Sequence, residues 1–144
     1  MSLAGWFERR TGRPLIECNV LLPRLGLQSD VTLLVDTGAD RTMLAPMEIA
    51  LLGLDPFLLT NPQSLFGVGG LVDAHRESAI ISFTDASAVY EYRLDILVVA
   101  QDRSGSSLYS LLGRDILNRW HMTYRPTENR LEFDVVSADD QLDL

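Results

Sequence analysis

The feature that most constrains this chain is a short apolar run at 33–35 that leads directly into Asp36-Thr37-Gly38-Ala39. Such a run is typical of a buried strand, and the glycine that follows indicates a tight turn. The pattern therefore predicts a carboxylate that leaves the end of a strand into a turn. A carboxylate in that position is held rigidly and still reaches a cleft, as acid-base chemistry requires.

Two further motifs follow along the chain. A Gly-Val-Gly-Gly segment at 67–70 lies between two apolar pairs, and Leu-Leu-Gly-Arg-Asp-Ile-Leu at 111–117 opens an expected C-terminal helix. Together with the Asp36 turn, these motifs resemble those of the retropepsins, the single-domain aspartic proteases of retroviruses and their cellular relatives. The family has an Asp-Thr-Gly-Ala-Asp turn, a glycine-rich flap tip and a Gly-Arg-(Asn/Asp) segment in this order. Here the three span residues 33–117.

Short strands separated by turn residues dominate the rest of the pattern. Residues 15–22 and 31–35 are extended apolar segments joined through a proline and a glycine, which predicts a hairpin leading into the active-site turn. Apolar and charged residues alternate over 90–98, which is the period of a half-buried strand. Short helices are predicted over 46–52 and 113–120, and a closing hairpin is predicted over 122–135.

The strand pattern agrees with the fold that the resemblance implies. That fold is all-β: a small closed acid-protease barrel with a flap hairpin and one or two short helices, assembled as a homodimer. We expect an N-terminal extension over 1–13, a retropepsin-like domain over 14–136 and an acidic tail over 137–144. Because the tail carries three carboxylates in eight residues, it is typical of a solvated end.

Asp36 is the predicted catalytic residue, acting first as general base on a water molecule and then as general acid on the leaving amine. Aspartyl catalysis of water attack uses two carboxylates that share one proton. Since the chain carries the Asp-Thr-Gly element once, we expect Asp36 from each of two subunits to form the pair. The alternative role for Asp36 is an Asx turn, in which the side chain caps its own loop.

The resemblance gives the next three residues supporting roles. Thr37 is expected to hydrogen-bond across the dimer axis. Gly38 either lets a substrate backbone approach or supplies a turn with positive φ, and the sequence leaves both uses open. Ala39 stands where many pepsin-like enzymes have a serine, whose hydroxyl can donate to the catalytic carboxylate and lower its pKa. Because alanine cannot donate, activity is expected at milder acid pH.

Two charged residues and the glycine-rich segment complete the predicted site. Asp40 and Arg114 match family positions that pair beside the active site, with Asp40 also meeting the substrate backbone; a surface ion pair of little energetic value is the alternative. The predicted flap tip, which opens to admit a peptide and closes to exclude water, consists of Phe66, Gly67, Val68, Gly69 and Gly70. A phosphate-binding loop is disfavoured because no Lys-Ser/Thr pair follows.

Composition narrows the possible partners. The formal net charge of -8, from 20 acidic and 12 basic residues, repels phosphate backbones, so we expect peptide or protein substrates and no nucleic acid. No apolar stretch approaches membrane-spanning length, so no membrane contact is expected. The first ten residues lack the apolar core of a signal peptide. The single cysteine, Cys18, lies in an apolar segment, which favours a reducing, cytoplasmic location.

Other chemistries have weaker signals. His75 and His121 have no second ligand at metal spacing, so neither a metal nor another cofactor is expected. The alternative function from a different class is a non-catalytic peptide-binding or dimerisation module on the same scaffold. Such a module has no need for paired carboxylates at a dimer axis, where like charges cost stability. The sequence therefore favours an aspartic endopeptidase.

Overall fold

The computed structural model describes residues 2–67, 70–101 and 109–144. Its strands are β1 (Leu3–Ala4), β2 (Trp6–Phe7), β3 (Pro14–Leu22), β4 (Leu27–Val35), β5 (Met43–Leu44), β6 (Pro62–Gly67), β7 (Gly70–Thr84), β8 (Ala88–Gln101), β9 (Leu111–Leu112), β10 (Trp120–Arg125), β11 (Arg130–Val135) and β12 (Asp140–Asp143). The helices are α1 (Pro46–Leu52) and α2 (Arg114–Leu117), with single 3-10 turns η1 (Pro56–Leu58) and η2 (Pro126–Glu128).

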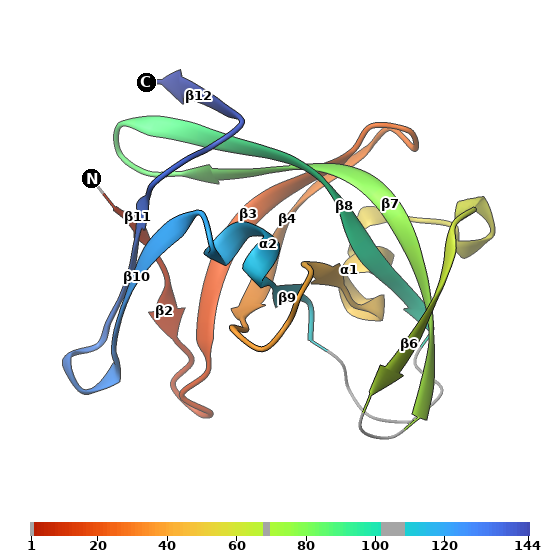
Figure 1. Ribbon diagram of the computed structural model, residues 1–144, viewed down its shortest axis with the longest axis horizontal. Coiled ribbons are helices and arrows are strands. Elements are labelled where there is room, and N and C mark those ends of the chain that lie inside the picture. The colour runs from red at the N-terminus through yellow and green to blue at the C-terminus, as the bar shows by residue number, and fades with distance from the viewer. Residues whose placement is uncertain (1, 68–69, 102–108) are drawn as a thin grey trace.

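Six of these strands close into a barrel. Hydrogen-bonded neighbours follow the order β8-β5-β9-β4-β3-β7, and β7 pairs again with β8. In Figure 1 the long β7–β8 pair crosses the β3–β4 pair, and β6 and β7 form a hairpin that extends past the barrel. The mostly-β, closed-barrel fold predicted from the sequence is confirmed.

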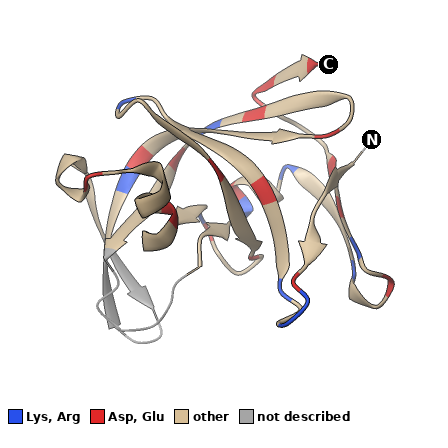
Figure 2. Cartoon of the chain, turned by 180° about the vertical axis from the view of Figure 1, so that it is seen from behind, with Lys and Arg blue, Asp and Glu red and all other residues tan. Residues whose placement is uncertain are grey.

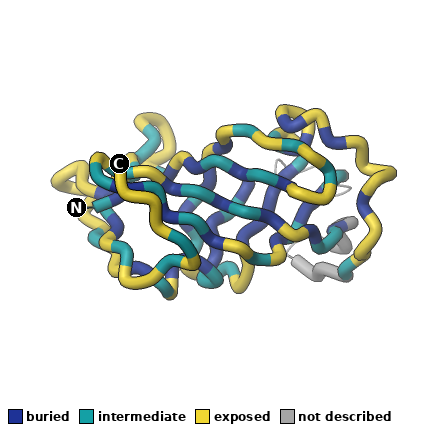
Figure 3. Tube along the Cα trace, turned by 90° about the horizontal axis from the view of Figure 1, so that it is seen from above, coloured by how far each residue is buried: buried dark blue, intermediate teal, exposed yellow. Residues whose placement is uncertain are grey.

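The β3–β4 hairpin positions the Asp36 turn. Its register runs from Leu22↔Leu27 at the connection to Leu15↔Leu34 at the open end, in agreement with the predicted hairpin. Val31, Leu33 and Val35 alternate into the core, because successive side chains of a strand point to opposite faces. Figure 3 shows this alternation of buried and partly buried positions along the central strands, with exposed positions in the connecting loops. The chain thus leaves β4 at a fixed orientation.

A second, three-stranded sheet of order β1-β11-β10 packs against one end of the barrel. Aromatic side chains form its junction with the barrel. The Trp120 ring packs edge to face against the Phe83 ring, with 4.7 Å between the ring centroids, and its centroid lies 5.1 Å from that of Phe133. The Trp120 indole N–H donates to the Tyr92 hydroxyl (2.7 Å), which in turn donates to a backbone carbonyl (2.8 Å). Each aromatic pair of this geometry contributes about 0.5–1.5 kcal/mol to stability beyond the effect of its buried area. The predicted hairpin over 122–135 is β10–β11.

The C-terminal segment is exposed at most of its positions, and it also forms a strand that its acidity did not indicate. Residues 140–143 form β12, which pairs antiparallel with β8 from Asp140↔Glu91 to Asp143↔Ala88. Backbone groups make this pairing, so the acidic side chains stay at the surface while the chain is ordered. Figure 2 shows acidic positions spread over the strands and this segment instead of gathering on one element.

Candidate active site

Asp36 occupies the strand-end position that the sequence indicated. It follows Val35, the last residue of β4, where β4 pairs in parallel with β9 at Val35↔Leu112. The Asp36 N–H donates to the Leu112 carbonyl at 3.0 Å, so the backbone is held up to the residue that bears the carboxylate. The side chain is half-buried. The fold therefore fixes the origin of this carboxylate on two neighbouring strands.

Within the turn, the Asp36 side chain also holds its own loop. The Gly38 N–H donates to Asp36 Oδ1 at 2.9 Å, and the Ala39 N–H donates to the Asp36 carbonyl at 3.2 Å. This is the Asx turn considered from the sequence, and it uses only one carboxylate oxygen. Within the part of the chain that the structure describes, Asp36 Oδ2 accepts no hydrogen bond. One oxygen therefore orients the group, and the other is available for chemistry.

Gly38 has a close neighbour in Asp36 but no left-handed backbone conformation. Its φ lies outside the left-handed region, whereas Gly12, Gly26 and Gly53 have positive φ. A Cβ placed on Gly38 would lie 3.2 Å from Asp36 Oδ1, which is tighter than ordinary contact. Of the two uses left open by the sequence, the turn with positive φ is not found, and approach of a substrate backbone stays a prediction.

Arg114, the first residue of α2, braces the far side of the turn. Its Nη1 donates to the Thr37 carbonyl at 3.1 Å, its Nη2 pairs with Asp40, and its backbone N–H donates to the Ala39 carbonyl at 2.9 Å. The Asp40 and Arg114 side chains are 83% and 43% exposed, so their ion pair adds at most about 1 kcal/mol. The three contacts of Arg114 together tie α2 to the turn.

Sequence reasoning missed the partner of Asp115. Thr42, which is fully buried, donates its backbone N–H to Asp115 Oδ2 (2.8 Å) and its hydroxyl to Asp115 Oδ1 (2.7 Å). The same hydroxyl accepts the Gly113 N–H at 3.2 Å. A carboxylate at the start of an apolar helix signals that a buried donor must lie nearby, because burial without a partner is costly. The sequence could not say which donor.

Gly113 lies against the backbone of the loop that follows Asp36. A Cβ there would be 2.5 Å from the Arg41 carbonyl carbon, a distance that real side chains do not tolerate. The Gly-Arg-Asp motif thus has three separate functions in this fold: close approach, a brace for the turn and a carboxylate cap for Thr42. Ser110 is a further buried polar residue missed from the sequence, and its hydroxyl accepts the Ala45 N–H and donates to Glu48.

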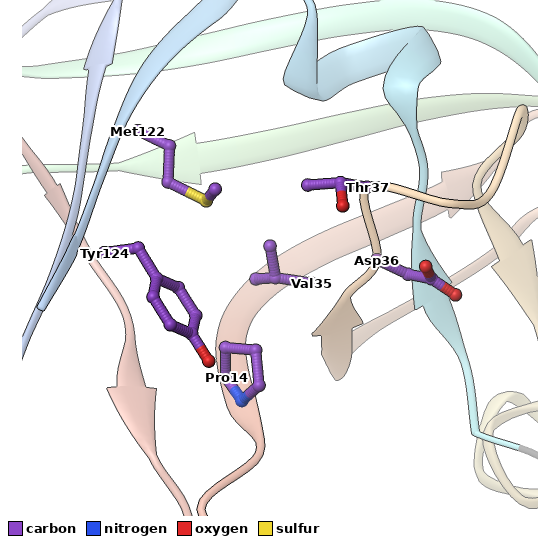
Figure 4. Close-up of a pocket in the computed structure, with 6 residues that line it drawn as sticks. All are labelled: Pro14, Val35, Asp36, Thr37, Met122 and Tyr124. Atoms are coloured by element: carbon purple, nitrogen blue, oxygen red, sulfur yellow. The ribbon is translucent and has the colours of Figure 1, made fainter. Parts of the chain in front are cut away.

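A pocket of about 450 Å³ adjoins the turn, lined by Pro14, Val35, Asp36, Thr37, Met122 and Tyr124. In Figure 4 the Thr37 side chain is directed toward Met122, while the Asp36 carboxylate points away from Met122 and Tyr124. The Asp36 carboxylate and the Thr37 side chain therefore lie on two different sides of the turn. Neither Met122 nor Tyr124 was singled out from the sequence, because their nearness to Asp36 depends on how the second sheet packs.

Phe66, Gly67 and Gly70 of the predicted flap lie on strands β6 and β7. Phe66 pairs with Leu71 and Gly67 with Gly70 in the backbone register. Val68 and Gly69 lie outside the described residues. The backbone of the expected flap therefore forms a hairpin up to its last described pair.

Metal and thiol chemistry receive no support from the described part of the chain. No group of three or more His, Cys, Asp or Glu side chains within 2–67, 70–101 and 109–144 could hold a metal ion. Cys18 is buried, and burial raises the pKa of its thiol, with Asp30 and Glu17 adding to the effect. None of the described helices has the length and apolarity to cross a membrane.

A closed six-stranded barrel with an Asp-Thr-Gly turn at the end of a barrel strand defines the retropepsin-like fold, and this chain has that fold. Among solved structures it is similar to a retropepsin-like aspartic protease from Rickettsia conorii, with 20% sequence identity, a TM-score of 0.57, and 89% of this chain and 95% of that chain covered. It is also similar to EIAV protease complexed with the inhibitor HBY-793, with 20% identity, a TM-score of 0.46, and 77% and 90% covered. No family model and no curated protein matches the sequence.

Proposed function

We propose that the protein is an aspartic endopeptidase that hydrolyses peptide bonds in extended substrates, with Asp36 from each of two copies forming the catalytic pair. One observation carries the proposal: a half-buried carboxylate at the end of a barrel strand, with one oxygen held by the Gly38 N–H and the other without a hydrogen bond from the described residues. The retropepsin-like fold supports it.

In this mechanism the two carboxylates share one proton, because like charges at short range disfavour each other's ionisation. The ionised Asp36 takes a proton from a water molecule as the water oxygen bonds to the peptide carbonyl carbon. The protonated Asp36 of the second copy donates its proton to the carbonyl oxygen. The first Asp36, now protonated, then gives its proton to the peptide nitrogen, and the second Asp36 takes a proton back from a hydroxyl of the tetrahedral intermediate as the carbonyl re-forms. The carbon–nitrogen bond breaks in this step, and no covalent link to the protein forms.

Neighbouring residues hold the pair and the substrate. We assign Thr37 to a hydrogen bond between the copies, and Gly38 and Ala39 to the turn that orients the carboxylate. Asp40 is assigned to the substrate backbone, with Arg114 as its ion-pair partner. The predicted flap segment at 66–70 is assigned to closure over an extended peptide. The buried, unpaired Cys18 agrees with a cytoplasmic location, which is part of the proposal.

The proposal is tested by incubating a diverse peptide mixture with the wild-type protein and with Asp36→Asn across pH 3–8, and reading the products by mass spectrometry. Asp143→Asn is the matched control, since it removes the same charge from β12 at the surface. We expect cuts with the wild type and the control, and none with Asp36→Asn. Parallel samples prepared in the same way exclude a contaminating protease.

A different result would favour the alternative function. Absence of Asp36-dependent cuts at every pH, from a sample shown to be folded and dimeric, would contradict the endopeptidase. Retained binding of extended peptides by that sample would then indicate a non-catalytic peptide-binding module on the same scaffold.

A further inference from the structure

A second pocket lies at the base of the β6–β7 hairpin, where strand β7 lacks a neighbour on one side. Strand β6 pairs with β7 as far as Pro62↔His75, and β3 pairs with it from Leu21↔Ile80 onward. Between these two points no described strand pairs with this side of β7. A pocket of about 110 Å³ lies at this gap, lined in part by residues 76–78.

Polar side chains line this pocket, and its two arginines differ in their partners. Arg24 donates from Nε and Nη2 to the two carboxylate oxygens of Glu77, at 3.1 and 2.6 Å, so the charge of this buried carboxylate is balanced. Arg76 forms no ion pair among the described residues, and its Nε is buried without a hydrogen-bond partner. A buried donor of a charged group is costly to leave unpaired. Arg76 therefore offers an unfilled place for an anionic group.

A carboxylate without an ion pair faces the same pocket. Asp95 of β8 lies opposite Ser78 of β7 and accepts a hydrogen bond from the Ser78 hydroxyl at 2.9 Å, but it pairs with no described arginine. Arg76 and Ser78 are two positions apart on β7, so their side chains share a face of the sheet. Arg76 and Asp95 are thus diagonal neighbours, about 7–8 Å apart. The pocket presents one positive and one negative group that do not neutralise each other.

A small zwitterion matches this pair of charges. Phosphate, with its higher negative charge, would be repelled by Asp95, and a simple amine would leave Arg76 without an anion. A free α-amino acid carries its carboxylate and its ammonium group on one carbon, so it can meet both groups at once. A peptide terminus carries only one of these charges. The pocket has room for about four water molecules at about 30 Å³ each, which limits the ligand to glycine, alanine or serine.

We propose that this pocket binds a small free α-amino acid, with its carboxylate on Arg76 and its ammonium group on Asp95. The Thr60 and Asn61 side chains also line the pocket and can donate further hydrogen bonds to the carboxylate. The Arg76 N–H donates to the Asn61 carbonyl at 2.8 Å, so the ligand lies where the hairpin joins the barrel. The inference goes beyond the proposed function and does not depend on it, because this pocket shares no lining residue with the pocket beside Thr37.

The site is tested by titrating the isotopically labelled protein with L-alanine and following the backbone amide signals by NMR. We expect saturable shifts at residues 60–61 and 76–78, with a dissociation constant of about 1 mM, because so small a ligand makes few contacts. Acetate and ethylamine each carry one of the two charges. Each should bind at least about tenfold more weakly than alanine, since one charged group of the pocket then stays unpaired.

Two variants assign the two charges. Arg76→Gln and Asp95→Asn each remove one charge and keep a hydrogen-bonding side chain, and each should weaken alanine binding at least about tenfold. Asp95→Asn should also abolish the preference for alanine over acetate. Arg10→Gln is the matched control: it removes an exposed arginine from the turn between β2 and β3, and it should leave the dissociation constant unchanged. The same spectra show whether each variant is folded.

The outcomes separate this inference from the proposed function. Absence of saturable shifts at alanine concentrations far above the expected dissociation constant would overturn the site, and so would shifts confined to residues around Asp36. Acetate that binds as tightly as alanine, together with unchanged alanine binding by Asp95→Asn, would overturn the zwitterion as the ligand. Each of these results leaves the endopeptidase standing. Absence of Asp36-dependent cleavage would contradict the endopeptidase and leave the alanine titration unaffected.

Discussion

Asp36 and Asp115 are both half-buried carboxylates beside the same loop, yet their surroundings differ. Both oxygens of Asp115 accept hydrogen bonds from Thr42, one from the backbone N–H and one from the hydroxyl. Asp36 accepts one, from the Gly38 N–H. Asp115 stabilises the loop with its full hydrogen-bonding capacity, whereas Asp36 keeps one oxygen for another partner. Hydrogen-bond satisfaction, and not burial, distinguishes the structural carboxylate from the candidate catalytic one.

The largest expected effect is on activity. Asp36→Asn should lower kcat/KM on any peptide that the wild type cleaves by at least about a thousandfold, because an amide cannot act as general base. Its thermal unfolding should stay close to that of the wild type, since the amide oxygen still accepts the Gly38 N–H. Enzyme kinetics and calorimetry on the same samples test both parts. Activity within tenfold of the wild type would remove Asp36 from the chemistry.

Gly113→Ala should give the largest loss of stability. The new methyl group would lie 2.5 Å from the Arg41 carbonyl carbon, and we expect a cost of about 3 kcal/mol, measured by urea unfolding. Gly12→Ala is the control: that position has positive φ but open space, so only about 1 kcal/mol of backbone strain is expected. Equal costs at the two positions would contradict the close approach.

Thr42→Val tests the role given to Asp115. The variant keeps the shape but removes the hydroxyl, which leaves Asp115 Oδ1 and the Gly113 N–H without this partner, and we expect about 2 kcal/mol of destabilisation. Thr42→Ser keeps the hydroxyl and should lose less than half as much. If serine and valine cost the same, packing and not the hydrogen bonds explains the buried threonine.

Ala39→Ser is expected to add a hydrogen bond to the Asp36 carboxylate and to leave the hydrogen bonds of Asp115 unchanged. A serine hydroxyl that donates to the charged carboxylate favours ionisation, so the acid limb of the pH–rate profile should move to lower pH by about one unit. Ala39→Val, which adds bulk without a donor, is the control and should not move the limb. A limb unaffected by serine would mean that the hydroxyl does not reach the carboxylate.

Asp139 extends the comparison as a third carboxylate with both oxygens bonded. The Arg93 backbone N–H, followed by the Arg119 side chain, lowers the pKa of Asp139. The contribution of Asp139 to the free energy of unfolding is therefore present above its unfolded-state pKa, and it is lost as the pH falls through its folded-state pKa. Asp139→Asn should narrow the stability difference between pH 7 and pH 2 by about 0.5 kcal/mol, because the group is partly solvated. An unchanged stability difference between pH 7 and pH 2 would contradict a stabilising role for the Asp139 charge.

The local features of the site could be predicted from the sequence, and the distant contacts could not. The strand before Asp36 and the hairpins follow from apolar periodicity, which depends only on neighbouring residues. The pairing of Asp115 with Thr42, 73 positions apart, exists because barrel closure brings β9 beside β4 and β5. The spacing of residues along the sequence does not indicate which distant residues barrel closure brings together.

Two elements show where sequence patterns give incomplete answers. The amphipathic segment over 113–120 predicted one helix, but α2 ends at Leu117 and Trp120 begins β10, because its indole packs in the aromatic junction between the sheets. The acidity of 137–144 predicted a solvated end but gave no sign of β12, which forms through backbone bonds that side-chain charge does not oppose. In both cases tertiary contacts formed structure that the local signal did not contain.

The central claim is that one active site uses Asp36 from two copies. Co-expression of differently tagged wild-type and Asp36→Asn chains, with purification of the mixed dimer through both tags, tests it directly. If the two carboxylates act as one pair, the mixed dimer should have about a thousandth or less of the wild-type activity. A mixed dimer with half the wild-type activity would show that each chain works alone, and would contradict the account.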